Sequence, residues 1–196
     1  MIRNLIKKMF PRGKIINILS NPNGLTLFRV AASPIIVILL LSPSRTRAFI
    51  AALIFSAAAI TDFLDGFFAR LKGLVSNFGK VMDPIADKVL TSASFIMLTA
   101  LGWVPAWIVC IIIGREIAVT GLRNIIAQKG SDLSASSLGK YKTGFQIAAI
   151  IPLMIHFPYL SIDFHAIGTI FLWVALTLTI WSGAAYFIRY RRFLQF

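Results

Sequence analysis

Acidic residues are scarce in this chain, which has 7 Asp and Glu against 20 Lys and Arg in 196 residues and a formal net charge of +13. No soluble basic domain with interleaved aromatic side chains accompanies this positive charge, which argues against nucleic acid as a partner. The single cysteine, Cys110, lies within an apolar run. It is expected to pack there, and one thiol says nothing about the redox compartment. The N-terminus lacks a continuous apolar stretch, so no cleavable signal peptide is expected.

Apolar residues are abundant instead. They make up 58% of the chain, and the mean hydropathy is +0.82. These values are typical of polytopic membrane proteins. Apolar segments at roughly 25–41, 48–69, 81–101, 104–127, 143–160 and 165–188 each reach the ~20 residues that span a bilayer once their flanking turns are included. Residues 21–196 are therefore predicted to form one all-α domain of six transmembrane helices.

The first 20 residues are predicted to form a separate element. Residues 1–14 place apolar side chains on one helical face, with basic and polar side chains opposite; the apolar ones are Ile2, Leu5, Ile6, Met9 and Phe10. This pattern favours an amphipathic helix that lies on an anionic membrane surface without crossing it. A frayed basic tail is the alternative.

Lys and Arg gather in alternate connections between the apolar segments. The first 14 residues carry five of them, and the other basic groups are Arg70, Lys72 and Lys80, then Lys129, Lys140 and Lys142, then Arg189, Arg191 and Arg192. The third and fifth connections carry none, and only Arg45 and Arg47 break the alternation. The positive-inside rule therefore places both termini and the even-numbered connections of this multi-pass protein in the cytoplasm.

Four of the seven acidic residues are aspartates at fixed spacing inside apolar sequence. They form Asp62-x-x-Asp65-Gly66-x-x-Ala69-Arg70, eight residues, and then Gly79-x-x-x-Asp83-x-x-x-Asp87. Carboxylates at membrane depth are costly unless they are paired, hydrated or bound to metal. The spacings i, i+3 and i, i+4 put each pair on one helical face, and the short connection makes the two helices antiparallel neighbours. The four carboxylates are therefore expected to converge.

Oxygen ligands of this kind select hard divalent cations such as Mg²⁺ or Mn²⁺. Four carboxylates suit two metals at ~3.5–4 Å, an arrangement that holds the attacking and leaving oxygens of a phosphoryl displacement. Gly66 and Gly79 leave room for a ligand beside the backbone, and Arg70 can bind phosphate oxygens. Each feature alone has a structural reading as a cap, a helix contact or an interfacial charge. Capping accounts for neither Asp65 nor Asp87, however.

The stretch Asp62–Asp87 reproduces D-x2-D-G-x2-A-R-x8-G-x3-D-x3-D and in this resembles the CDP-alcohol phosphatidyltransferases. The resemblance implies a six-helix membrane enzyme, usually a homodimer, with two divalent cations, Mg or Mn, on Asp62, Asp65, Asp83 and Asp87. It also implies that Asp87 is the general base. The expected contacts to the CDP-lipid are Asn23, Thr26, Gly66, Ala69, Arg70, Ser76 and Gly79.

Three further stretches resemble the bacterial phosphatidylglycerophosphate synthases of that family: Asn21–Arg29, Gly114–Arg123 and Gly139–Thr143. The resemblance implies CDP-diacylglycerol and sn-glycerol 3-phosphate as substrates, with membrane lipids as surroundings. It also implies the inner membrane of a bacterium, with the active site on the cytoplasmic side. Asn124 is a departure, because relatives often carry an acidic residue there. Two rivals remain open, which are a cardiolipin synthase with phosphatidylglycerol as acceptor and a divalent-cation transporter. The chain shows no obvious internal repeat, which weakens the transporter reading.

A glycerol 3-phosphate acceptor is a small dianion and needs fixed cations beside the metals. The residues predicted to bind its phosphate are Arg115, Arg123, Lys140 and Lys142, although ordinary cytoplasmic-side charges are the alternative for Lys142. Arg115 and Glu116 are expected to point to different helical faces and so not to pair.

Two histidines and three aromatic side chains are predicted to lie at the opposite membrane surface. His156 and His165 are expected to be interfacial residues near that surface, too far from the aspartates for catalysis. Trp103, Trp107 and Tyr159 are expected to form an aromatic belt there.

Overall fold

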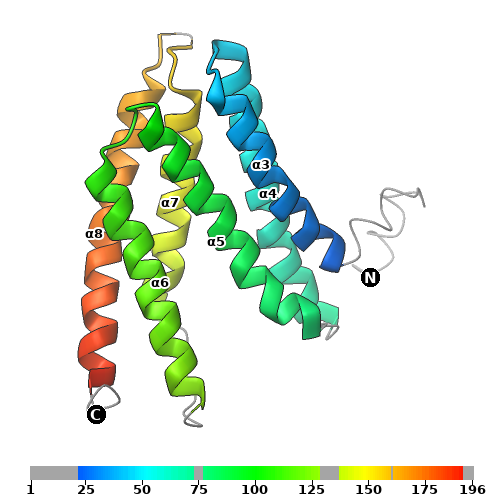
Figure 1. The fold of residues 1–196 in the computed structure, drawn as a ribbon, viewed down its shortest axis with the longest axis vertical. Helices are drawn as coiled ribbons and strands as arrows, with labels where there is room; N and C mark the ends of the chain where they lie inside the picture. The colour runs from blue at the N-terminus through cyan, green and yellow to red at the C-terminus, as the bar shows by residue number, and fades with distance from the viewer. Residues whose placement is uncertain (1–21, 73–76, 129–136, 160, 192–196) are drawn as a thin grey trace, which may run out of the picture.

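The computed structural model describes residues 22–72, 77–128, 137–159 and 161–191, and its side chains over 27–61, 82, 85–126, 141–159 and 161–191. Six helices account for almost all of this part of the chain (Figure 1). They are α3 (Pro22–Leu41), α4 (Arg45–Lys72), α5 (Asn77–Ala100), α6 (Ala106–Gln128), α7 (Ser137–Ile155) and α8 (Phe164–Tyr190). The prediction of an all-α fold with six helices is confirmed for the described residues. The amphipathic segment predicted over 1–20 lies outside the described residues.

Local sequence explains where the helices end. Gly102 has a φ of +71°, a left-handed conformation that suits glycine, and it follows the last turn of α5. Asp163 caps α8, with its carboxylate accepting a hydrogen bond from the backbone N–H of Ala166 at 3.0 Å. Pro43 and Pro105 fall in the connections before α4 and α6, where a missing N–H costs nothing.

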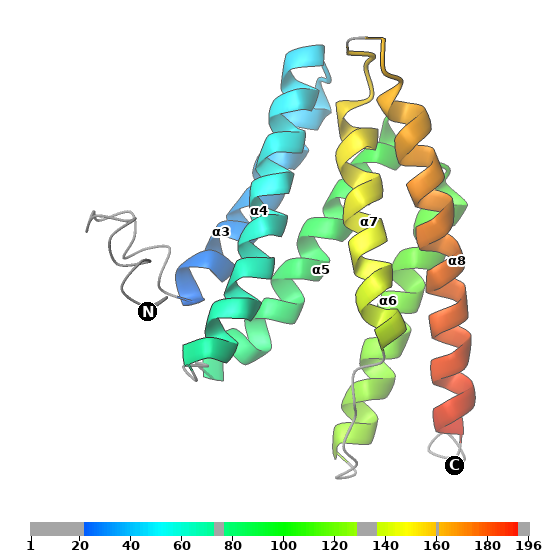
Figure 2. The same cartoon turned by 180° about the vertical axis from the view of Figure 1, so that it is seen from behind.

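The helices run alternately up and down, as Figures 1 and 2 show. One end of the bundle holds the start of α3, the end of α8, and the adjoining ends of α4 with α5 and of α6 with α7. The helix α3 packs against α4 and α5, while α7 packs against α8 and α4. The helix ends that flank the basic connections therefore all lie at one end of the bundle.

A buried apolar cluster joins α3, α4, α5, α6, α7 and α8. Small side chains line the inner face of α4, where Ala48, Ala51, Ala52 and Ala58 are each at most 3% exposed. Phe55 and Phe95 fill the space between them and the neighbouring helices, both almost fully buried. Small residues of this kind let helix backbones approach closely, which is how helices associate when lipid removes the hydrophobic driving force.

Among the residues whose side chains are described, one helix, α8, is long and apolar enough to cross a membrane by length and composition alone. The described side chains of α3 and α7, over Leu27–Leu41 and Tyr141–Ile155, are apolar as well, but these stretches cover only part of each helix. The six-span topology thus stays a prediction. Cys110 is exposed on α6, so the expectation that it packs in the core is wrong. An apolar run does not say which face of the helix is buried.

The two arginines that break the charge alternation bind backbone oxygens at the end opposite the basic connections. Arg45 donates from Nη2 to the carbonyl of Pro158 at 2.8 Å, and its guanidinium lies 4.2 Å from the centre of the Tyr159 ring. Arg47 donates from Nη1 to the carbonyl of Ser42 at 2.9 Å. Arg45 thereby ties the start of α4 to the connection between α7 and α8, which gives it a structural role.

Both histidines lie at this same end, as predicted. The His156 ring stacks on Trp103 with centroids 3.9 Å apart, and it meets His165 edge-on at 4.8 Å. Trp103 is therefore a packing partner of His156. Trp107, by contrast, is 51% exposed. The aromatic belt stays a prediction.

Candidate active site

The four aspartates of the sequence motif fall on the two helices that meet at the 73–76 connection. Asp62 lies as far before the end of α4 at Lys72 as Asp87 lies after the start of α5 at Asn77, about 15 Å along each helix. Asp65 and Asp83 lie about 10 Å from the same ends. The helix bounds therefore put these positions at two matched levels. The side chains of Asp62, Asp65 and Asp83 are not among the described ones, so the metal site stays a prediction. Four carboxylates are a donor set that fits hard divalent cations.

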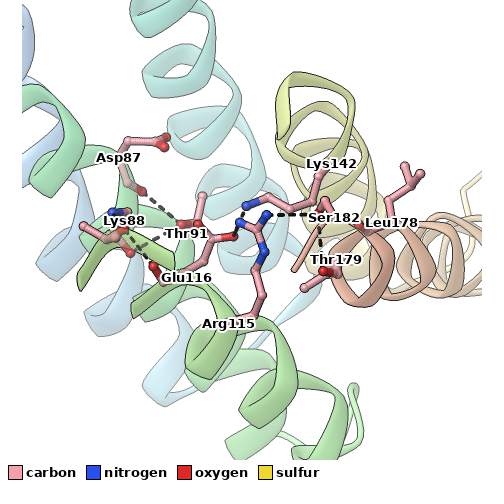
Figure 3. A network of polar contacts seen from close by, with 10 residues as sticks. Asp87, Lys88, Thr91, Arg115, Glu116, Lys142, Leu178, Thr179 and Ser182 are labelled. Carbon is pink, nitrogen blue, oxygen red and sulfur yellow. Dashed lines mark hydrogen bonds and ion pairs between the residues drawn. The ribbon is translucent and has the colours of Figure 1, made fainter. Parts of the chain in front are cut away.

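Asp87 is partly buried, and its backbone carbonyl accepts a hydrogen bond from Thr91 Oγ1 at 3.0 Å. In Figure 3 its carboxylate lies apart from the contacts among Arg115, Glu116 and Lys142. The carboxylate and that network are therefore separate parts of the site.

Arg29 on α3 is a buried cation to which the sequence motifs assign no role. The side chain of Arg29 is 1% exposed, on a helix that packs against both aspartate-bearing helices. Arg29 lies about 10 Å from the start of α3, in the half of that helix that is nearer the basic end of the bundle. A charged residue inside an apolar segment is the sequence signal that could have drawn attention to it.

Most of the residues predicted to contact the CDP-lipid belong to helix ends that lie at this same end of the bundle. Asn23 and Thr26 belong to the first turns of α3, and the others fall near the adjoining ends of α4 and α5: Gly66, Ala69, Arg70 and Gly79. Ser76 lies outside the described residues. The side-chain contacts of this set stay a prediction.

A network of charged and hydroxyl side chains joins α5, one of the two aspartate-bearing helices, to α6, α7 and α8 (Figure 3). Lys142 on α7 forms an ion pair with Glu116 on α6. Arg115 Nη1 lies 3.6 Å from Glu116 Oε1. The expectation that Arg115 and Glu116 do not pair is therefore wrong: both side chains are long enough to bend toward each other although their Cβ atoms leave the helix in different directions.

Two hydroxyl groups extend the network. Arg115 donates from Nη2 to Ser182 Oγ on α8 at 2.9 Å. Lys88 on α5, next to Asp87 in sequence, donates to Thr120 Oγ1 on α6, and that hydroxyl donates to the carbonyl of Glu116 at 2.7 Å. The network thus begins one residue from the predicted base and ends on the last helix.

The charges of this network do not balance. Lys88, Arg115 and Lys142 are cations, and Glu116 is the carboxylate that two of them contact. The Lys142 side chain is 4% exposed, the Arg115 side chain 13% and the Glu116 side chain 20%. Cations held at low exposure strengthen a charge-assisted hydrogen bond to an anion. The arrangement therefore suits a small, multiply charged anion.

Of the four residues predicted to bind the acceptor phosphate, the structure brings two together. Arg115 and Lys142 meet through Glu116, whereas Arg123 is exposed two turns farther along α6. The side chain of Lys140, near the start of α7, lies outside the description. The sequence reasoning missed Lys88 and Ser182, and it gave Glu116 no role, because nothing local in the sequence indicates these cross-helix contacts.

Similarity to known proteins is extensive. A family model described as CDP-alcohol phosphatidyltransferase matches residues 19–181. A protein of Bacillus subtilis (strain 168) named CDP-diacylglycerol–glycerol-3-phosphate 3-phosphatidyltransferase is 43% identical over 179 residues, covering 85% of this chain and 92% of its own. Proteins of the same name are 40% identical in Rickettsia bellii (85% and 92% covered) and 37% identical in Escherichia coli K12 (84% and 91% covered).

Proposed function

The chain belongs to the CDP-alcohol phosphatidyltransferase family, and we propose that it transfers the phosphatidyl group of CDP-diacylglycerol to sn-glycerol 3-phosphate. The products are phosphatidylglycerophosphate and CMP. Relatives at 37–43% identity that carry the name of this activity support the assignment. The observation in the structure that carries it is the cationic network of α5, α6 and α7, which begins at Lys88, the residue after Asp87.

That juxtaposition supplies what the reaction needs from the protein. A phosphorylated acceptor must be held by cations while its hydroxyl lies near a base. Arg115 and Lys142 are the two cations of the predicted set that the structure brings together, and Lys88 connects them to the helix turn that carries Asp87. Arg123 and Lys140 complete the proposed acceptor site. An uncharged acceptor would leave this excess of positive charge unexplained.

Asp87 is proposed to remove the proton from the 1-hydroxyl of glycerol 3-phosphate while the oxygen of that hydroxyl attacks the lipid-linked phosphorus. The bond from that phosphorus to the CMP oxygen breaks, and CMP leaves with the electron pair. Two divalent cations, Mg²⁺ or Mn²⁺, held by Asp62, Asp65, Asp83 and Asp87, would supply charge stabilisation to the diphosphate. Arg70 is proposed to bind the donor diphosphate, beside Gly66, Ala69, Ser76 and Gly79, with Asn23 and Thr26 on α3.

The proposed setting is the inner membrane of a bacterium, with six spans and with both termini and the active site on the cytoplasmic side. The gathering of basic connections at one end of the bundle supports this orientation. The membrane setting itself is supported by large apolar side chains directed outward, among them Ile38, Ile170 and Trp181, each at least 65% exposed. A homodimer and an amphipathic helix over residues 1–20 complete the proposal.

The decisive experiment measures CMP release by purified protein supplied with CDP-diacylglycerol. The expected result is release that requires both glycerol 3-phosphate and Mg²⁺ or Mn²⁺, and that stops on chelation. Equal release with phosphatidylglycerol as acceptor would move the protein to the cardiolipin-forming branch of the family. Absence of release with either acceptor, from folded protein with metal, would contradict the assignment.

A further inference from the structure

The last helix presents a polar stripe toward α6. Thr179, Ser182, Gly183 and Tyr186 recur at the spacing of one helical face and are all buried. The rest of α8 is strongly apolar in sequence, with isoleucine and tryptophan side chains exposed. The helix α8 packs against α6. On α6, Arg115 is the residue that contacts both Ser182 and Gly183 of this stripe.

Gly183 supplies the space that the stem of Arg115 occupies. A Cβ atom at position 183 would lie 3.0 Å from Arg115 Cγ, 3.5 Å from Nε and 3.9 Å from Cδ. A carbon–carbon approach of 3.0 Å is closer than the optimal separation of about 3.5–4.0 Å, so Arg115 would have to move. The glycine thus determines how closely the arginine lies against α8.

Ser182 fixes the other end of the same side chain. Its hydroxyl accepts from Arg115 Nη2 at 2.9 Å and donates to the carbonyl of Leu178 at 2.6 Å, so the hydroxyl itself is oriented by the helix (Figure 3). Glu116 lies on the opposite side of the guanidinium, 3.6 Å from Nη1. A methyl group at position 183 would push the stem of Arg115 by a few tenths of an ångström, and the guanidinium that Ser182 and Glu116 hold lies at the end of that stem.

Further polar capacity lies along the stripe. Among the described residues, Thr179 Oγ1, Tyr186 OH and Arg115 Nε are buried without a hydrogen-bond partner. The contact between α6 and α8 is therefore partly polar. Simple apolar packing between α6 and α8 would not place these atoms there.

We propose that α8 is the positioning element of the acceptor site, with Gly183 and Ser182 setting the direction of the Arg115 guanidinium toward the phosphate of the acceptor. The inference rests on the proposed function, because it takes Arg115 to bind that phosphate. Gly183 and Ser182 are positioning residues that act through Arg115. They are not proposed to touch either substrate.

The test compares steady-state constants for both substrates in Gly183→Ala and Ser182→Ala. A lost charge-assisted hydrogen bond weakens binding by about 10- to 100-fold, and a misdirected one belongs at the lower end of that range. Gly183→Ala is expected to raise the KM for glycerol 3-phosphate about tenfold and to leave the KM for CDP-diacylglycerol within about twofold. Ser182→Ala should show the same bias, and Ser182→Thr, which keeps the hydroxyl, should restore most of the affinity.

Matched controls are available on α7 and α8. Gly144→Ala places the same methyl group where nothing lies within 4 Å, and should change neither KM. Gly168→Ala forces a Cβ to 2.8 Å from the backbone nitrogen of Leu153, so it should lower thermal stability without the acceptor bias. Thr177→Ala removes an exposed α8 hydroxyl that makes the same kind of helix hydrogen bond, to Trp173 at 2.9 Å, and should be neutral.

The double variant Arg115→Ala, Gly183→Ala separates positioning from a general packing defect. If Gly183 acts through Arg115, adding Gly183→Ala to Arg115→Ala should change the glycerol 3-phosphate KM by less than about twofold. A tenfold effect that persists without Arg115 would overturn the inference, as would equal effects on both substrates. Ser182→Ala provides the same test if Gly183→Ala does not fold. If Arg115→Ala itself leaves the acceptor KM unchanged, the acceptor-site assignment in the proposed function has failed instead.

Discussion

Lys142 on α7 pairs with Glu116 on α6, and only 4% of the lysine side chain is exposed. An ammonium group at that burial needs its carboxylate, because an unpaired charge in a low-dielectric interior is costly. The same carboxylate lies near Arg115, so Glu116 holds two of the cations proposed to bind the acceptor. Removing the Glu116 carboxylate should therefore affect both the stability of the fold and the binding of the acceptor.

Glu116→Ala is expected to destabilise the protein by about 3 kcal/mol, the scale for breaking a buried ion pair from one side. Thermal unfolding in detergent measures this loss. The double variant Glu116→Ala, Lys142→Met removes both charges and should regain much of the stability. Stability equal to wild type in Glu116→Ala alone would show that Lys142 is adequately solvated without its partner.

Asp87→Asn should leave a folded protein whose turnover falls at least ~10²-fold, the usual scale for loss of a general base. The rate of CMP release at saturating substrates checks this. Asp163→Asn is the matched control: Asp163 caps α8 at the opposite end of the bundle, and asparagine caps helices equally well. Near-normal turnover in Asp87→Asn would remove Asp87 from catalysis.

Arg115→Ala and Lys140→Ala should raise the KM for glycerol 3-phosphate by about 10- to 100-fold and that for CDP-diacylglycerol little. Arg70→Ala should show the opposite bias, because Arg70 is proposed to hold the donor. Arg47→Ala, which removes a guanidinium bound to the carbonyl of Ser42 at the far end, should change neither constant. Equal impairment of both substrates in Arg115→Ala and Lys140→Ala would mark these two charges as structural.

Single cysteines should report opposite sides of the membrane at the two ends of α4. In a Cys110→Ser background, Lys72→Cys should be labelled from the cytoplasm and Arg47→Cys from outside, as the positive-inside rule requires. Replacing Cys110 is necessary because its thiol is exposed on α6. Labelling of position 72 from outside would reverse the orientation and separate the aspartate end from cytoplasmic glycerol 3-phosphate.

Acid should weaken the connection between α7 and α8. Burial lowers the pKa of His156, which follows the last residue of α7, and the charge of His165 lowers it further while Asp163 opposes the shift. The stability tied to neutral His156 is present above its ordinary pKa of 6.5 and is lost as the pH falls through the lower folded value. His156→Gln should flatten thermal stability between pH 7.5 and about 5. An unchanged pH profile in that variant would assign the effect to other groups.

Family similarity and local periodicity made much of the molecule predictable from sequence. The six helices follow from apolar segments broken by glycine, proline and polar turns, features that act within a few residues. The aspartate motif fixes its own spacing along α4 and α5, and alternating charge identifies the basic end of the bundle. Arg45 was the misleading signal, because its contacts with Pro158 and Tyr159 come from a segment far away in the chain.

Only the tertiary structure decided which side chains meet. The partners of Lys142, Lys88 and Arg115 lie 26, 32 and 67 residues away, at Glu116, Thr120 and Ser182. Sequence periodicity assigns a residue to a face of its own helix, but it does not say which helix that face will touch or where a long side chain will bend. Helix packing settles both, because the rotation and approach of α5, α6, α7 and α8 determine which buried charges can reach a partner.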